Sequence, residues 1–149
     1  MKYAILLIIS LNAFTVKSQT SEDSIKTVIN RMFTAMKNGD AAMLKSCFAD
    51  SAILQTVLSS KEGKISVETE PLAEFADFVG KQEKGVADEQ IVFETLKTDG
   101  QLALAWAPYK FYYKGKFSHC GIDSFQLVKI NGEWKIQYLI DTRRKTGCE

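Results

Sequence analysis

The sequence predicts an α+β fold, in which helices pack on one face of an antiparallel sheet. Between residues 21 and 48, apolar residues recur at three- and four-residue spacing, which is typical of amphipathic helices. From residue 90 onward the pattern changes to strand-like segments, separated by the turn signals Asp99-Gly100, Lys114-Gly115 and Asn131-Gly132. Helices followed by a run of strands with tight turns favour segregated layers over an alternating α/β arrangement.

The first helix is predicted to begin at Ser21 and to end at Gly39. Ser21 offers a capping hydroxyl, and the two acidic residues that follow it face the positive end of the helix dipole. Its apolar stripe consists of Ile25, Val28, Ile29, Met32, Phe33 and Met36. Gly39 suits the position that ends a helix, and Asp40 is expected to cap a second, short helix.

Two short strands and a third helix are predicted next. Residues 53–58 and 65–67 form the strands, which a glycine-containing turn connects. Pro71 suits the first position of a helix, and Gly80 ends that helix. The polar stretch 81–88 predicts a loop.

Four consecutive strands are predicted to complete the fold as an antiparallel meander. They span residues 90–97, 102–113, 117–130 and 134–141. Pro108 interrupts the second of them, which argues for a bulge or a sheet edge at that point. Long strands with such bends allow a sheet to wrap into a half-barrel, whose concave face the helices can cover.

The N-terminus predicts a cleavable signal peptide, residues 1–18, rather than part of the fold. Met1-Lys2 is positively charged, residues 3–16 are mostly apolar, and cleavage after Ser18 suits a signal peptidase. One mature domain, residues 19–149, is then expected in the periplasm or outside the cell. The apolar stretch is short for a bilayer span, so we expect no membrane association after cleavage.

The charge of the mature chain excludes one broad class of partner. Removal of Lys2 and Lys17 leaves 17 basic and 18 acidic residues, a net charge of −1 without a basic block. Nucleic-acid binding depends on a concentration of positive charge, so we expect no nucleic-acid partner.

Two segments resemble the nuclear transport factor 2-like superfamily, which includes SnoaL-like and ketosteroid isomerase-like proteins. The stretch Asn38-Gly39-Asp40-Ala-Ala-Met-Leu44, followed by Cys47 to Ala52, resembles its helix-turn-helix-to-strand opening. Gly132-Glu133-Trp134-Lys135-Ile136 is similar to the entry of its last strand. More narrowly, the run from Trp106 to Arg144 resembles exported bacterial members described as lumazine-binding-like.

This resemblance implies a cone, in which three helices pack into a strongly bent sheet that opens to a pocket at one end. Members are often homodimers through the outer sheet face. Some are isomerases, dehydratases or cyclases that use neither a metal nor an organic cofactor, and many only bind ligands or partners. The fold alone therefore does not define the function.

His119 is the only histidine of the chain and the first candidate for chemistry. On a strand, His119, Asp123 and Phe125 share one face, because side chains alternate with a period of two, and Phe125 is therefore expected to contact a ligand. His119 could act as a general acid or base tuned by Asp123, or it could be hydrogen-bonded within the sheet. Residues four apart on a strand lie about 13 Å apart. Direct contact would therefore need a bulge, for which Gly121 is suited.

Aromatic and polar residues nearby extend the candidate ligand-binding set. Trp106 and Tyr109 are expected to reach the pocket, whereas most of the surrounding aromatic residues pack in the core or at a dimer surface. Asp141 and Arg143 are expected at the mouth of the cone, where Arg143 is suited to an anionic ligand, or else as an ion pair at the strand end. Gln55 is a further polar candidate in the first strand.

Three cysteines, Cys47, Cys120 and Cys148, allow one disulfide after export. We favour the pair Cys120–Cys148, because the tail could fold back on the sheet; the alternative is that Cys47 and Cys120 are simply small buried residues. Their spacing does not match a metal site.

The sequence thus predicts an exported small-molecule-binding protein with an apolar pocket for a hydrophobic or aromatic ligand, without a cofactor or metal. The alternative is a cofactor-independent lyase or isomerase, with His119 as general acid or base and Asp123 or Tyr109 assisting.

Overall fold

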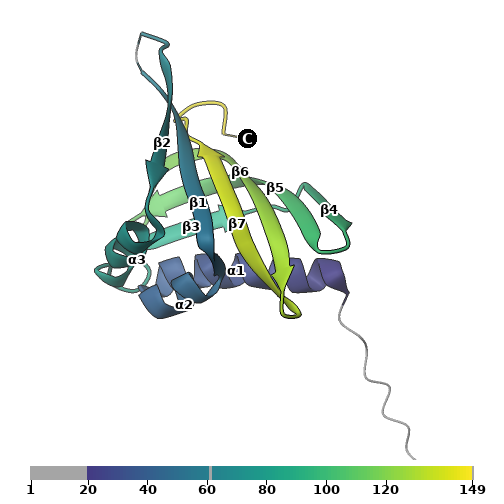
Figure 1. Cartoon of the computed structure of the whole chain (residues 1–149). Coiled ribbons are helices and arrows are strands. Elements are labelled where there is room, and N and C mark those ends of the chain that lie inside the picture. The colour runs from purple at the N-terminus through teal and green to yellow at the C-terminus, as the bar shows by residue number, and fades with distance from the viewer. Residues whose placement is uncertain (1–19, 61, 149) are drawn as a thin grey trace, which may run out of the picture.

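A strongly curved sheet wraps around the long first helix in the computed structural model, which describes residues 20–60 and 62–148 (Figure 1). The predicted signal peptide lies outside these residues. The described helices are α1 (Ser21–Asn38), α2 (Ala41–Ser46) and α3 (Leu72–Gly80). The described strands are β1 (Phe48–Ser59), β2 (Ile65–Glu70), β3 (Ala87–Ile91), β4 (Thr95–Asp99), β5 (Leu102–Tyr113), β6 (Lys116–Ile130) and β7 (Glu133–Thr142). The α+β cone predicted from the sequence is confirmed.

The sheet has the order β2-β1-β7-β6-β5-β3, and β4 pairs with β5 beyond the end of β3. All neighbouring strands are antiparallel except β1 and β7, which are parallel. A hairpin forces an antiparallel pair, but β1 and β7 are joined through most of the domain, so their direction is not constrained by a turn. The sheet is therefore mixed at this one pair, where the sequence predicted only antiparallel pairing.

The helix ends follow the predicted capping chemistry with one correction. Thr20, not Ser21, caps α1, because its side-chain oxygen accepts a hydrogen bond from the Asp23 amide. Asp40 caps α2 in the same way through the Met43 amide, as predicted. Gly39 adopts a left-handed conformation with φ of 68°, which allows the chain to turn directly from α1 into α2.

The predicted strand 90–97 is two strands, β3 and β4, and the break between them lies opposite Pro108. The Pro108 carbonyl oxygen accepts a hydrogen bond from the Val92 amide, and β4 then takes over as the partner of β5 from Thr95. Proline cannot donate a backbone hydrogen bond, so the ladder is interrupted where its N–H would be needed. The alternating residue pattern alone does not reveal this break.

Strand β5 is apolar on both faces, as its sequence predicted. The alanines Ala103, Ala105 and Ala107 are buried on the concave face, beneath the core that α1 completes. On the convex face, Leu102, Leu104 and Trp106 are 53%, 42% and 43% exposed. Small residues allow a close approach of the helix layer.

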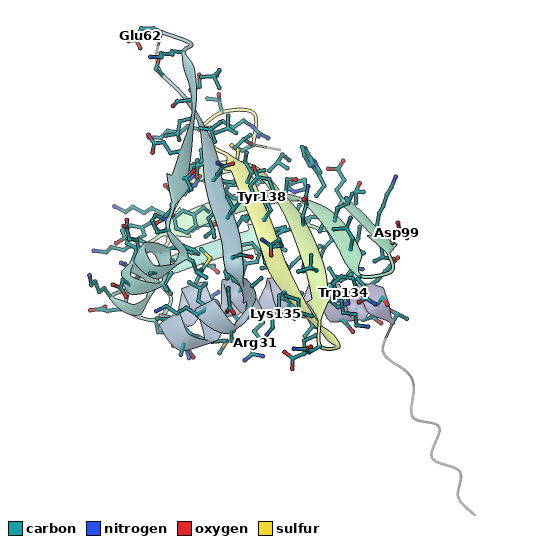
Figure 2. All side chains as sticks on the ribbon, in the orientation of Figure 1. Arg31, Glu62, Asp99, Trp134, Lys135 and Tyr138 are labelled. Atoms are coloured by element: carbon teal, nitrogen blue, oxygen red, sulfur yellow. A yellow bond between two sulfur atoms is a disulfide. The ribbon has the colours of Figure 1, made fainter. Side chains whose placement is uncertain are left out.

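Tyr138 marks the convex face of β7, and Glu62 marks the tip of the projecting β1–β2 hairpin (Figure 2).

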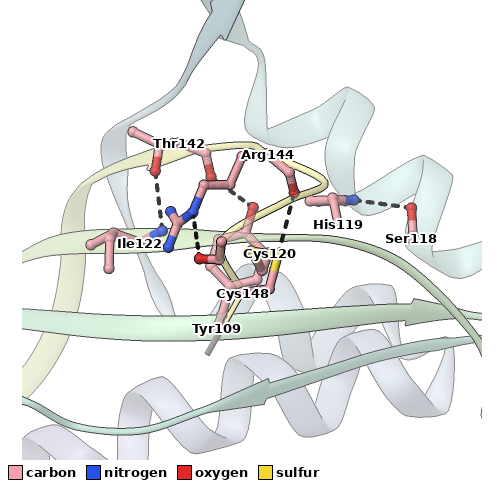
Figure 3. The surroundings of a disulfide bond; sticks show 9 residues. Tyr109, Ser118, His119, Cys120, Ile122, Thr142, Arg144 and Cys148 are labelled. Atoms are coloured by element: carbon pink, nitrogen blue, oxygen red, sulfur yellow. Dashed lines mark hydrogen bonds between the residues drawn. A yellow bond between two sulfur atoms is a disulfide. The ribbon is translucent and has the colours of Figure 1, made fainter.

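A disulfide ties the C-terminal tail to the sheet. Cys120 on β6 and Cys148 are bonded, with their Cα atoms 5.8 Å apart, which confirms the favoured pairing (Figure 3). Cys120 and Arg144 also exchange two backbone hydrogen bonds of 2.9 and 2.8 Å. Cys47 is a free, buried thiol. The tail therefore extends the sheet next to the strands that carry His119 and Asp141.

Candidate functional site

The open end of the cone contains a cavity between α1, α3 and the concave face of the sheet. Its inner part has a volume of about 80 Å³, and a wider outer part has a volume of about 280 Å³. The two parts share lining residues, namely Met36, Glu70, Phe75, Glu89, His119 and Arg143. Together they reach the lower end of the range of roughly 300–1,000 Å³ that is typical of ligand sites.

The two sides of the inner cavity differ in chemistry. The helix side and the floor are apolar and consist of Met32, Phe33, Met36, Leu54, Phe75 and Leu139. The strand side is polar and consists of Gln55, Thr56, Glu70, Glu89, Tyr109, His119, Asp123, Asp141 and Arg143. The pocket is therefore amphipathic, whereas the sequence predicted an apolar one.

Asp141 is the centre of a hydrogen-bond network on the polar side. Its carboxylate accepts from the Thr56 hydroxyl at 2.6 Å and from Arg143 Nε at 2.8 Å. The Tyr109 hydroxyl lies 3.2 Å from Asp141 Oδ2 and 2.9 Å from the Thr142 carbonyl oxygen. Burial raises the pKa of Tyr109, and the negative charge of Asp141 raises it further. Arg143 also donates to Thr56, so its guanidinium is held on the wall by groups of the chain itself.

A second acidic centre pairs Asp123 on β6 with Glu89 on β3. Asp123 is 3% exposed, and its Oδ2 has no hydrogen-bond donor among the described residues. Both residues line the inner cavity, and each carboxyl group affects the pKa of the other. Burial raises the pKa of Glu89 to about 7, and burial together with the charge of Glu89 raises the pKa of Asp123. Both shifts favour a protonated carboxyl group within the pair.

His119 lines both parts of the cavity but does not have Asp123 as its partner. Its Nδ1 lies 3.0 Å from the Ser118 hydroxyl oxygen (Figure 3). Its ring packs edge-on against Tyr109 and tilted against Phe111, with centroids 5.7 and 5.1 Å away. Burial, and next the positive charge of Arg143, lower the pKa of His119. Both effects favour the neutral form of the imidazole.

The bulge near His119 lies at Ser118 rather than at Gly121. Phe111 pairs with His119 and the next residue pairs with Phe117, so Ser118 is the extra residue. Gly121 has a different role, because a Cβ atom there would overlap the Thr142 carbonyl oxygen and the Tyr109 ring. The glycine allows the end of β7 to approach β6, which brings the Asp141 network to the cavity.

Two of the residues expected to bind a ligand do not reach the cavity. Trp106 lies on the convex face, because it alternates with the buried alanines of β5. Phe125 shares the concave face with His119 and Asp123, but α1 covers it, and its ring packs edge-on against Phe33 at 6.2 Å. Gln55 borders the cavity, but its side-chain amide is bonded to Tyr138 on the convex face and to Thr69, and it therefore points away from the cavity.

Glu89 is the principal residue that the sequence analysis missed. It falls at the edge of the predicted loop 81–88, whereas β3 begins at Ala87. Ala87 and Ile91 flank Glu89 at a spacing of two, so a strand drawn from Ala87 would have placed the Glu89 side chain inward.

Among residues 20–60 and 62–148, no group of three or more His, Cys, Asp or Glu side chains is arranged to hold a metal ion. No helix within the same residues is long and apolar enough to cross a membrane.

Solved structures support the same fold. An NTF2-like protein from Shewanella baltica, of unknown function, has a TM-score of 0.65 and 16% identity over 87% of this chain and 100% of its own. A protein from Methylobacillus flagellatus with the same description has a TM-score of 0.63 and 18% identity over 87% of this chain and 97% of its own. A domain of unknown function with a cystatin-like fold, from Nostoc punctiforme, has a TM-score of 0.65 and 19% identity over 88% of this chain and 82% of its own.

No curated protein matches the chain. A family model described as "Putative lumazine-binding" matches residues 20–138. This match covers the domain from the cap of α1 into β7, and it agrees with the cone and with the NTF2-like solved structures. The chain therefore belongs to the family described as "Putative lumazine-binding", and its fold is that of the NTF2-like solved structures.

Proposed function

We propose that the chain binds a small molecule in the cavity at the open end of the cone. One observation carries this proposal: a concave site combines an apolar side with buried polar groups, one of which, Asp123 Oδ2, has no donor from the described chain. Such a site suits a ligand with a hydrophobic or aromatic body and a polar end. The description of the family also points to a small ligand.

Native mass spectrometry of the protein purified from its own host tests this proposal. We expect a bound small molecule that is lost from the variant His119→Trp, because the larger side chain would fill the space shared by both parts of the cavity. Tyr138→Trp adds bulk on the convex face and should retain the molecule. The proposal fails if the wild-type protein carries no ligand and binds none from a metabolite extract, or if both variants retain it.

The proposal places this binding protein outside the cytoplasm. The predicted signal peptide supports export, and the Cys120–Cys148 disulfide suits an oxidising compartment. Cell fractionation tests the location, and we expect the processed, oxidised protein in the periplasmic or secreted fraction. Recovery of the unprocessed chain in the cytoplasm would contradict it.

The proposal also includes a homodimer through the convex sheet face. Leu102, Leu104 and Trp106 form an exposed apolar row there, of the kind that a second subunit would cover. Sedimentation should give a dimer for the wild-type protein and a monomer for Leu104→Glu. A monomeric wild-type protein would contradict this part of the proposal.

A second candidate function is cofactor-independent proton transfer by a lyase or isomerase. The Glu89–Asp123 pair favours it, because a carboxyl group with a pKa near neutrality is suited to accept and donate protons. In this mechanism the pair, rather than His119 with Asp123, carries the proton. The test is deuterium exchange at the α-carbon of 2-tetralone in D₂O, followed by NMR. Exchange that Asp123→Asn abolishes and His119→Ala retains would support this assignment, and exchange no faster than in buffer would exclude it for this substrate.

A further inference from the structure

We infer that the polar end of the ligand is an ammonium group, so that the cavity selects small hydrophobic or aromatic amines. This inference deepens the proposed binding function and rests on it. Three independent features of the cavity support it: its excess of carboxyl groups, the missing donor at Asp123, and the aromatic lining of its outer part.

The charges that line the cavity favour a cation. Four carboxyl groups are present, those of Glu70, Glu89, Asp123 and Asp141. Arg143 is the only lysine or arginine among the lining residues, and both of its side-chain hydrogen bonds go to Asp141 and Thr56. An anionic ligand would have to compete with Asp141 for this guanidinium and would face the remaining carboxyl groups.

Asp123 supplies the specific contact. Asp123 lines the cavity, and its buried Oδ2 has no hydrogen-bond partner among the described residues, a state that is costly. An ionised Glu89 carboxylate beside it is an acceptor only and supplies no donor. An ammonium group brings both a positive charge and N–H donors, so it can take the place of the shared proton and lie between the two carboxylates.

The outer cavity provides a surface that suits the rest of such a ligand. Its lining includes the aromatic side chains of Phe75, Phe78, Phe111 and Tyr113, together with the His119 ring. Aromatic faces attract cations and also pack against apolar substituents. A carboxylate pair at the bottom and aromatic rings around the entrance match the two ends of an amine with a hydrophobic body.

The protonation of Glu89 couples this binding to pH. The polar groups that face Glu89 from the neighbouring elements are Asp123 and His119 on β6, Tyr109 on β5, Asp141 on β7, Arg143 after it and Glu70 at the end of β2. The parts of α1 and α3 that line this cavity are apolar, and the Lys37–Asp88 ion pair lies at a separate groove on the other side of Glu89. Because the Glu89 pKa is about 7, affinity for a cation should rise as the pH increases through neutrality.

Isothermal titration calorimetry with benzylammonium, benzyl alcohol and benzoate tests the inference. These probes share a ring and differ in charge at the polar end. At about pH 8 we expect benzylammonium to bind at least about tenfold more tightly than benzyl alcohol, and benzoate to bind least tightly. Asp123→Asn and Glu89→Gln should each reduce the affinity for benzylammonium by about tenfold or more, whereas the exposed control Glu94→Gln should not change it.

Binding at about pH 6 provides the second measurement. Benzylammonium should bind more weakly there than at about pH 8 and should release more protons on binding, which titrations in buffers of different ionisation enthalpy detect. Glu89→Gln should remove most of this pH dependence. Circular dichroism of each variant checks that it is folded, and if Asp123→Asn is unfolded, Glu89→Gln carries the same test.

The inference is overturned if benzyl alcohol or benzoate binds as tightly as benzylammonium, or if neither carboxyl variant changes the affinity. If benzyl alcohol binds and His119→Trp prevents this, the cavity is a small-molecule site and only the preference for amines is wrong. If none of the probes binds and the protein from its own host carries no ligand, both the inference and the proposed function fail.

Discussion

The concave face of the sheet has two halves that are built from the same strands but contain opposite chemistry. Where α1 covers β5, β6 and β7, the inward side chains are apolar and fully buried, as in Phe125, Leu127 and Ile136. Farther along the same strands, where the helix cover ends, the inward side chains are Tyr109, Asp123 and Asp141. On β6 the inward side chains change from apolar to polar between Phe125 and Asp123, which are two residues apart. On β7 the same change occurs between Ile136 and Asp141, which are five residues apart.

This difference distinguishes the residues that stabilise the fold from the residues that give the cavity its chemistry. In the covered half, burial of apolar surface favours folding without any need for polar partners. In the open half, Asp141 is compensated by hydroxyl groups and Arg143, whereas Asp123 lies near the Glu89 carboxyl group and its Oδ2 has no partner among the described residues. We therefore expect mutations in the first half to alter stability and mutations in the second half to alter ligand binding and pH dependence.

The largest expected effect is that of Phe125→Ala in the covered half. Removal of this fully buried ring, which packs against Phe33, should lower the free energy of unfolding by about 3–5 kcal/mol. His119→Ala changes the same strand and the same face in the open half, and it should cost much less because His119 is only partly buried. Urea denaturation of both variants checks this, and similar losses would show that the two halves do not differ as proposed.

The second expected effect concerns the disulfide, which holds the tail beside the open half. Cys148→Ser should lower the free energy of unfolding by about 2–4 kcal/mol, because the unfolded chain loses the constraint between residues 28 apart in sequence. A reducing agent should lower the thermal midpoint of the wild-type protein to that of Cys148→Ser and leave the midpoint of the variant unchanged. A variant as stable as the oxidised wild-type protein would contradict this.

Much of the fold could be predicted from the sequence because its signals are local. β5 begins and ends at the predicted residues, since glycine-containing turns border it on both sides. The break between β3 and β4 was missed because it depends on where Pro108 meets its neighbour across the sheet. The parallel pairing of β1 and β7 also depends on tertiary contacts that local patterns do not encode.

The cavity was less predictable, because alternation identifies a face of the sheet but not what covers it. Phe125 and His119 share a face, yet only His119 reaches the cavity, and the position of α1 decides this. His119, four residues away on the same strand, is one of the partners that the sequence allows for Asp123. The structure pairs Asp123 with Glu89, which comes from another strand and lies 34 positions earlier.

The third expected effect is a pH dependence of stability that arises in the open half. The folded-state pKa of Glu89, about 7, is above its ordinary value of 4.5, and the pKa of Asp123 is raised too. At pH values between the unfolded-state and folded-state pKa, the folded protein binds more protons than the unfolded chain. The contribution of the Glu89–Asp123 pair to stability is therefore fully present at acidic pH and is lost as the pH rises. This loss should be on the order of 1–3 kcal/mol, given about 1.4 kcal/mol per pKa unit.

Urea denaturation of the wild-type protein and Glu89→Gln from about pH 4.5 to about pH 8 isolates this contribution. His119 contributes with the opposite sign, because its folded-state pKa is lowered, but it does so in both proteins. The difference between the two proteins should therefore favour the variant increasingly as the pH rises. The exposed control Glu94→Gln should run parallel to the wild type. If Glu89→Gln also runs parallel, the two carboxyl groups do not share a proton.

The smallest expected effect is that of Tyr109→Phe, which tests whether the Asp141 network is as self-sufficient as its geometry suggests. The variant removes one hydroxyl donor but leaves Thr56 and Arg143 on Asp141, so the free energy of unfolding should fall by only about 0.5–1.5 kcal/mol. Thr56→Val removes a shorter hydrogen bond to the same carboxylate and should cost at least as much. If Tyr109→Phe instead costs as much as Phe125→Ala, the open half also determines the stability of the fold, and the separation between the two halves is wrong.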